Sequence, residues 1–174
     1  MNRNLQRPWR RAARDALVSG SAASIGSAIV LSICSEIEEG APAGALNGPS
    51  QWLWGEGEAF TRRATLKHTA VGYTIHHASS IFWALLHERA FGGARKSAMR
   101  HCIEAAGTTV VAYLIDYHLT PGRLRPGFKK HLGAGSMFAA YAAFAGGLAA
   151  ASIARDHSDE NQQSHGPALT KKVK

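Results

Sequence analysis

The chain has 174 residues, which suits a single domain, and its mean hydropathy of −0.14 is low for a membrane protein. That average hides four apolar windows, because polar ends and loops dilute them. The formal net charge is +8, but the basic residues lie in short runs beside apolar segments and are not interleaved with aromatic ones. This layout is typical of membrane topology signals and argues against nucleic-acid binding.

The N-terminal part predicts a basic cytoplasmic segment over residues 1–15 and a first transmembrane helix over 16–35. The second stretch has 20 residues without formal charge and is rich in Gly, Ala and Ser, which allow close helix packing in lipid. A basic region followed by an apolar one also resembles a signal peptide, with a cleavage site at 41–43. The uncharged run is longer than a usual signal core, so a retained helix is favoured.

Residues 36–66 are predicted to form an outer loop, because Gly, Pro and Asn interrupt any long helix there. Trp52 and Trp54 fit two alternatives. They suit a segment lying at the membrane interface, where indole rings favour the headgroup level. They also suit a plain loop with two buried tryptophans.

The second predicted span covers residues 67–89. It contains 18 residues without formal charge, from Thr69 to Leu86, which is near the minimum for a helix crossing a bilayer. Two adjacent histidines, His76 and His77, lie at its centre. Helical periodicity turns these two side chains about 100° apart, so we expect His76 to face the bundle interior and His77 a neighbouring helix.

The third predicted span, residues 98–119, has only 11 residues between Glu104 and Asp116. We expect it to span only if these two acidic side chains face protein. The fourth, residues 132–154, has 23 residues without formal charge and a face of small residues. Residues 156–174 are polar without periodicity and predict a disordered cytoplasmic tail. The fold class is therefore all-α, with a four-span membrane domain over residues 16–155.

The distribution of Lys and Arg predicts that both chain ends lie in the cytoplasm. In that orientation 13 of the 20 basic residues are inside, which follows the positive-inside rule. The stretches HHASSIFWALLHE and DYHLTPGRLRPGF resemble uncharacterised small bacterial inner-membrane proteins over about residues 68–130. The resemblance implies a multi-pass protein of the bacterial inner membrane and brings no established activity.

Candidate site residues are the ionisable side chains of the second and third spans. If these spans are antiparallel, the end of one lies level with the start of the other, and three chemistries fit. Imidazoles and carboxylates together bind a transition metal, facing histidines bind haem, and a ladder of such groups relays protons. The candidate metal ligands are His76, His77, His87, Glu88, His101, Glu104, Asp116 and His118.

Structural roles are the alternative for the same residues. Glu88 is expected to pair with Arg89 or Arg100, and Asp116 with Arg123. No catalytic motif is present, so no reaction is predicted. One functional hypothesis is a small membrane protein with a His- and carboxylate-lined interior. The other is a structural or assembly subunit without chemistry, which forms a homo- or hetero-oligomer through the small-residue helices one and four.

Overall fold

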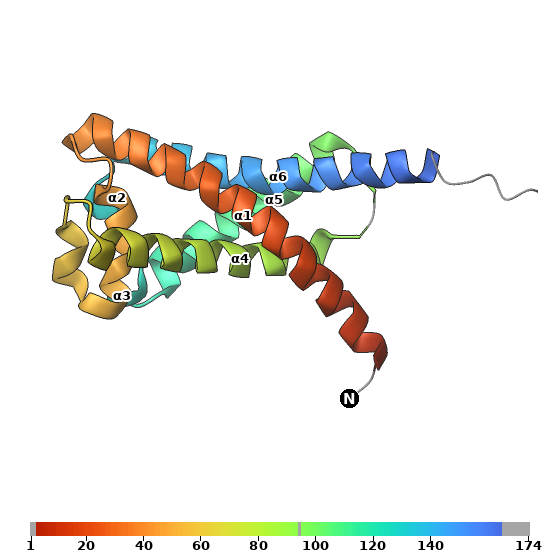
Figure 1. Ribbon diagram of the computed structural model, residues 1–174, viewed down its shortest axis with the longest axis horizontal. Helices are drawn as coiled ribbons and strands as arrows, with labels where there is room; N and C mark the ends of the chain where they lie inside the picture. Colours follow the sequence, from red (N-terminus) through yellow and green to blue (C-terminus); the bar gives the residue numbers. More distant parts are fainter. Residues whose placement is uncertain (1–2, 94, 165–174) are drawn as a thin grey trace, which may run out of the picture.

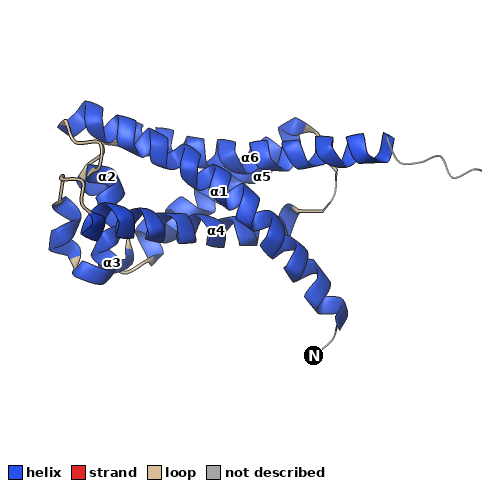
Figure 2. Ribbon diagram, in the orientation of Figure 1, coloured by secondary structure: helices blue, strands red, loops and turns tan. Residues whose placement is uncertain are grey.

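The computed structural model describes residues 3–93 and 95–164, and within these ranges all regular structure is helical (Figure 2). This confirms the all-α prediction for the described residues. Four long helices form a bundle (Figure 1). They are α1 (Arg3–Glu39), α4 (Val71–Phe91), α5 (Ala98–Leu114) and α6 (Ala134–Ser164), and α1 crosses α4 obliquely. A π-helical turn precedes α4, η3 (Leu66–Ala70), and another follows α5, η4 (Ile115–Leu119).

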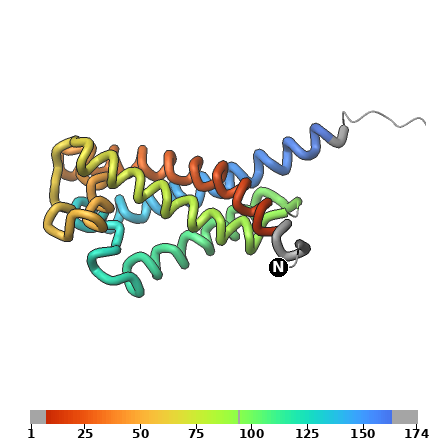
Figure 3. Tube along the Cα trace, turned by 60° about the horizontal axis from the view of Figure 1, so that its bottom comes forward, coloured from red at the N-terminus to blue at the C-terminus, as the bar shows by residue number. Residues whose placement is uncertain are grey.

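Successive long helices run in opposite directions, so the start of α1 and the end of α6 lie at the same end of the bundle (Figures 1 and 3). The turn between α4 and α5 lies there too. We call this the charged end. The opposite end is closed by short segments, which we call the cap.

The cap occupies the region predicted as an outer loop. It consists of α2 (Gly44–Asn47), η1 (Gly48–Ser50), α3 (Gln51–Trp54) and η2 (Glu56–Phe60). Two further short turns join it from the chain between α5 and α6, η5 (Gly122–Leu124) and η6 (Phe128–Lys130). Gly127, with φ +78°, meets Gly48 there: a Cβ atom on Gly48 would stand 2.9 Å from the Pro126 carbonyl oxygen. The glycines thus let two loops touch.

The two cap tryptophans are not both buried. Trp52 is half-buried, and its indole N–H donates to the carbonyl of Arg125 at 3.2 Å. Trp54 is 44% exposed and donates to the carbonyl of Lys67 at 2.9 Å. The alternative of a plain loop with two buried tryptophans is therefore wrong for Trp54.

Two of the described helices, not four, are long and apolar enough to cross a membrane. These segments are Pro8–Glu39, which contains the first predicted span, and Ala134–Gln162, which contains residues 134–154 of the fourth. The helix α5 has only 17 residues, and the adjacent histidines of α4 make that helix too polar. The second and third predicted spans are thus helices of the bundle that do not meet this requirement.

Helices extend into both predicted terminal segments. The helix α1 begins at Arg3 and runs through the predicted basic segment into the first predicted span, while residues 1–2 lie outside the described part. The helix α6 continues to Ser164 and projects beyond the bundle in Figures 1 and 3. Residues 156–164 of the predicted disordered tail are therefore helical, and 165–174 lie outside the described residues.

The bundle interior is built mainly from alanine and serine. One core cluster joins all four long helices around Trp83, Phe144 and Leu148, and a second lies near the cap around Leu31 and Met137. Small side chains let the helix backbones approach closely. The structure therefore uses the small-residue faces of α1 and α6 inside one chain, where they pack against each other.

Candidate functional site

A cavity of about 430 Å³ lies in the half of the bundle nearer the cap. All four long helices contribute to its wall, with η4 and parts of the cap. The wall is mostly apolar and aromatic, and includes Leu31, Ile75, Phe82, Trp83, Phe128 and Phe144. Two of the predicted site residues, His76 and Asp116, also line it. Apolar walls with a few placed polar groups are typical of small-molecule sites.

His76 faces the interior, as its helical position predicted. Its Nε2 atom lies 3.1 Å from Ser27 Oγ and 3.4 Å from the Ser24 carbonyl oxygen, both on α1. A carbonyl oxygen only accepts, and the Ser27 hydroxyl donates to the Ala23 carbonyl at 2.7 Å. The Ser24 carbonyl favours the tautomer in which Nε2 carries the proton, and in that tautomer this nitrogen does not ligate a metal.

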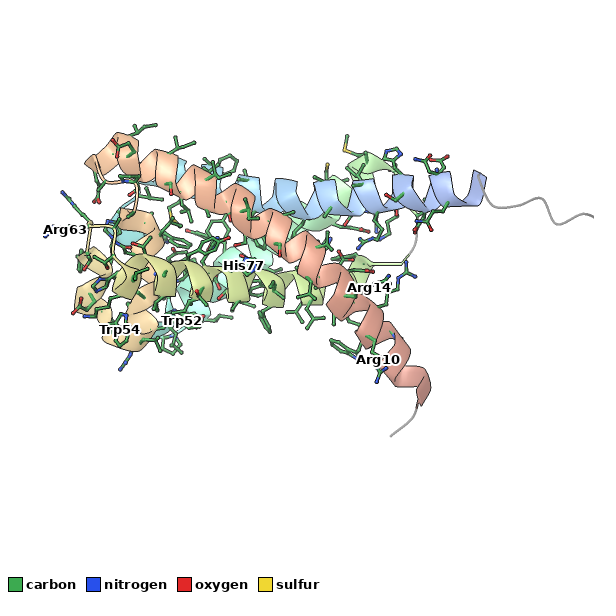
Figure 4. The ribbon with its side chains drawn as sticks, viewed as in Figure 1. Arg10, Arg14, Trp52, Trp54, Arg63 and His77 are labelled. Carbon is green, nitrogen blue, oxygen red and sulfur yellow. The ribbon has the colours of Figure 1, made fainter. Side chains whose placement is uncertain are left out.

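His77 does not line the cavity. Its ring packs against Tyr73 with the ring centroids 5.8 Å apart, and its buried Nδ1 atom has no hydrogen-bond partner. Figure 4 places it between the two ends of the bundle. The two adjacent histidines thus have different surroundings, and only one of them can contact a molecule in the cavity.

Asp116 lies in the π-helical turn η4 and accepts a hydrogen bond from the Tyr141 hydroxyl of α6 at 3.1 Å. The indole of Trp83 on α4 is a second hydrogen-bonding neighbour of this carboxylate. The expected pairing with Arg123 is not found: Arg123 donates instead to the backbone carbonyls of Trp52 and Leu53. Asp116 is thus held in the cavity wall by neutral groups.

The charged end brings together four of the predicted site residues, as the antiparallel arrangement indicated. A second hollow of about 260 Å³ lies there, lined in part by His87, Glu88 and His101. The Glu88 side chain is 1% exposed and pairs with Arg155 of α6 at 2.9 Å. This corrects the expected pairing with Arg89 or Arg100.

His101 and Glu104 lie three residues apart on α5 but contact different groups. His101 Nε2 lies 2.8 Å from Asp156 Oδ2 of α6, whereas Glu104 pairs with Lys96 and Arg100 at 2.7 Å each. His87 Nδ1 lies 2.9 Å from the Thr108 hydroxyl. Each of these side chains therefore has its own partner, and the His101–Asp156 and His87–Thr108 contacts join different helices.

The remaining predicted ligand, His118, is exposed and stacks edge-on against Tyr113 at 5.9 Å between centroids. Two histidines near the cap, His68 and His131, have carboxylate partners instead. His68 Nε2 lies 2.6 Å from Glu58, and His131 Nδ1 lies 2.7 Å from Glu39. The hydrogen bond to His68, then Lys67, holds the pKa of Glu58 below its ordinary value.

No group of three or more His, Cys, Asp or Glu side chains is placed to hold a metal ion within residues 3–93 and 95–164. Seven of the eight predicted ligands are instead divided among the cavity, the charged end and the surface, and the eighth, His77, packs against Tyr73. The donors present do not fit a haem either, because His76 Nε2 contacts Ser27 and Ser24 on α1 and His77 does not line the cavity.

Sequence reasoning missed several residues that complete these sites. Arg155 joins Glu88 to Asp15, and Tyr141 holds Asp116. The sequence does carry one signal for Arg155, an arginine after a long uncharged run. Asp15 lies directly before the first uncharged run, and Arg155 lies directly after the last one, so antiparallel helices would bring both residues to the same end of the bundle.

A search of known proteins found no match among family models, curated proteins or solved structures.

Proposed function

We propose that the chain is a membrane protein whose helical bundle holds a small, largely apolar molecule in the cavity beside α4. The observation that carries the binding proposal is the cavity itself. Its volume of about 430 Å³ lies within the range of about 300–1,000 Å³ that ligand pockets occupy. His76 and Asp116 supply the few polar contacts that would orient a ligand.

Support for membrane insertion comes from the reversed polarity of α1. Ile25, Ile29 and Ile33 are 51%, 55% and 53% exposed. Ser19 and Ser24 on the other faces are fully buried. Water would disfavour this arrangement, whereas lipid favours branched apolar side chains outside and small ones between helices. Apolar side chains are exposed on the other long helices as well: Phe82, Leu86, Met99, Ile103, Val110, Val111, Leu114 and Phe138.

The two ends of the bundle suit the two membrane surfaces. Figure 4 shows Arg10 and Arg14 toward one end, Trp52, Trp54 and Arg63 toward the other, and His77 between them. Basic and indole side chains favour the interface. In the proposed arrangement α1 and α6 cross the bilayer, while α4 and α5 lie beside them and enclose the cavity.

The proposed location is the bacterial inner membrane with both chain ends in the cytoplasm. The same-side termini of the bundle and the basic residues of the charged end support this orientation. The runner-up, a structural or assembly subunit, would have to dock through the exposed isoleucines of α1. The small-residue faces are not free for this role, because α1 and α6 pack against each other through them.

Membrane insertion is tested by washing isolated membranes in alkaline sodium carbonate. An inserted bundle stays in the membrane pellet and needs detergent for extraction. Recovery of a monomeric protein in the carbonate supernatant, still monomeric without detergent, would overturn the membrane proposal. A visible spectrum and metal analysis of the purified protein test the metal and haem alternatives. A Soret band or stoichiometric metal would favour these over the apolar ligand.

Ligand binding is tested with the neutral fluorescent probe N-phenyl-1-naphthylamine and protein in lipid nanodiscs. Trp83 and Trp52 line the cavity, so a probe held there receives excitation energy from tryptophan, whereas probe dissolved in lipid contributes a background that does not saturate. We expect a saturable signal that Ser79→Phe abolishes, because Ser79 lines the cavity. The matched control is Thr74→Phe, since Thr74 is exposed on the same helix outside the cavity. Equal signals in all three proteins would exclude binding at this site.

A further inference from the structure

Asp116 differs in one respect from the other carboxylates of the bundle. Every other carboxylate that is buried or half-buried in the described chain has a basic partner within 4.0 Å. Asp15 and Glu88 pair with Arg155, Glu104 pairs with Lys96, and Asp156 pairs with His101. The cap follows the same rule, with Glu39 against Arg62 and Glu58 against Lys67.

Asp116 has no such partner among the described residues. Its hydrogen-bonding neighbours are Tyr141 and Trp83, both uncharged donors. An ionised carboxylate in an apolar site is costly unless a positive charge compensates it. The fold thus supplies two hydrogen-bond donors but no cation, and the carboxylate faces a cavity large enough to admit one.

The surrounding wall is suited to a cation as well. The aromatic side chains of Trp52, Phe82, Trp83 and Phe144 line the same cavity. Aromatic faces attract cations that lie within about 6 Å of the ring centroid, and tryptophan does so most strongly. The apolar wall would receive the hydrocarbon part of a ligand, and the carboxylate would receive its charge.

From this geometry we infer that the cavity binds a hydrophobic cation, such as a substituted amine or a quaternary onium ion, with its positive charge against Asp116. This inference rests on the proposed function, because it names the ligand class of the same cavity. His76 Nε2 contacts Ser27 and Ser24 on α1, and His76 forms no ion pair with Asp116. An anion of the same shape would be repelled by the carboxylate.

The test compares tetraphenylphosphonium with tetraphenylborate, two ions of nearly equal shape and opposite charge. Binding is measured by equilibrium dialysis with the protein in nanodiscs of zwitterionic phosphatidylcholine, and uptake by empty nanodiscs is subtracted because both ions dissolve in lipid. Saturable binding of the phosphonium and not of the borate is expected. Asp116→Asn keeps an oxygen for Tyr141 and removes the charge, so it should weaken phosphonium binding by about ten-fold or more. Asp159→Asn is the matched control, because it makes the same substitution at an exposed carboxylate that does not line the cavity.

The neutral probe separates failure of this inference from failure of the proposed function. If N-phenyl-1-naphthylamine binds but the phosphonium does not, or if Asp116→Asn leaves phosphonium affinity unchanged, the inference is overturned and the cavity function stands. If neither compound binds saturably, both are overturned. Should Asp116→Asn fail to fold, the comparison of the two ions on the wild-type protein decides, and equal binding of the borate rejects the inference.

Discussion

Gly147 of α6 lies directly against Ala23 of α1: a Cβ atom added to Gly147 would stand 2.6 Å from the Ala23 backbone nitrogen. Real Cβ atoms do not approach a backbone atom so closely, so the crossing of the two longest helices depends on this glycine. Its neighbour Gly146 has open space where its Cβ would be. The pair therefore offers a matched test of how the bundle is held together.

We predict that Gly147→Ala destabilises the protein by about 1–3 kcal/mol through overpacking, despite the better helix propensity of alanine. Gly146→Ala gains the same propensity without the clash and should be neutral or stabilising. Thermal unfolding in detergent, followed by circular dichroism, measures both. Equal melting temperatures for the two variants would mean that α1 and α6 do not cross at this point.

A second prediction concerns Arg155, which joins α6 to Asp15 of α1 and Glu88 of α4. Arg155→Leu would leave two carboxylates that are 7% and 1% exposed without this partner. Removing one member of a buried ion pair typically costs about 3–5 kcal/mol. Denaturation of the purified variant in detergent gives the loss. The control Arg95→Leu removes an exposed pair with Glu160, which is worth at most about 1 kcal/mol.

The cause of the Arg155 effect can be checked in the same background. If the loss comes from uncompensated charge on Glu88, adding Glu88→Gln to Arg155→Leu should restore part of the stability. A double variant that is weaker than Arg155→Leu alone would instead show that the Glu88 carboxylate stabilises the fold through other neighbours.

Uncharged runs made the helices themselves predictable from the sequence. Helical periodicity also placed His76 inward, and antiparallel packing placed His87 and Glu88 near His101. These features depend on neighbours along the chain or on one turn between adjacent helices. The prediction of disorder for residues 156–164 was wrong. These residues are polar and have no amphipathic period, yet α6 continues through them, and Asp156 contacts His101.

Partners distant in the sequence could not be predicted in the same way. Asp15 and Arg155 are neighbours only because α1 and α6 cross, and Asp116 meets Tyr141 across two different helices. For Asp116 the sequence favoured a nearer basic residue, Arg123, which donates to backbone carbonyls instead. The metal hypothesis assumed that residues at one depth converge, but side chains at equal depth on α5, His101 and Glu104, face different neighbours.

A third prediction tests whether the exposed face of α1 lies in lipid. Ile25 is 51% exposed near the middle of the uncharged run, and Ile37 is 77% exposed near the end of the helix. A lysine at the centre of a spanning helix disfavours insertion by about 2.5–3.5 kcal/mol, whereas one near the end reaches the interface. Ile25→Lys should therefore reduce the membrane-inserted fraction strongly and Ile37→Lys only slightly. If Ile25→Lys yields a more soluble, folded protein without detergent, α1 faces water.

The last prediction separates the two central histidines. His76→Leu removes the contact with Ser27, but the Ser27 hydroxyl keeps its hydrogen bond to the Ala23 carbonyl, so no buried donor is left unpaired. Interhelical hydrogen bonds in membranes average about 0.6 kcal/mol, so we expect the free energy of unfolding to change by less than about 1 kcal/mol.

Binding should respond differently, because His76 lines the cavity and His77 does not. We expect His76→Leu to change the affinity for N-phenyl-1-naphthylamine by about three-fold or more, the equivalent of one such hydrogen bond. His77→Leu should leave that affinity unchanged, although it alters the contact with Tyr73. Titrations of both variants beside the wild-type protein provide the comparison. Wild-type affinity in both would show that neither histidine contacts the bound molecule, and an effect of His77→Leu alone would place the site on the other face of α4.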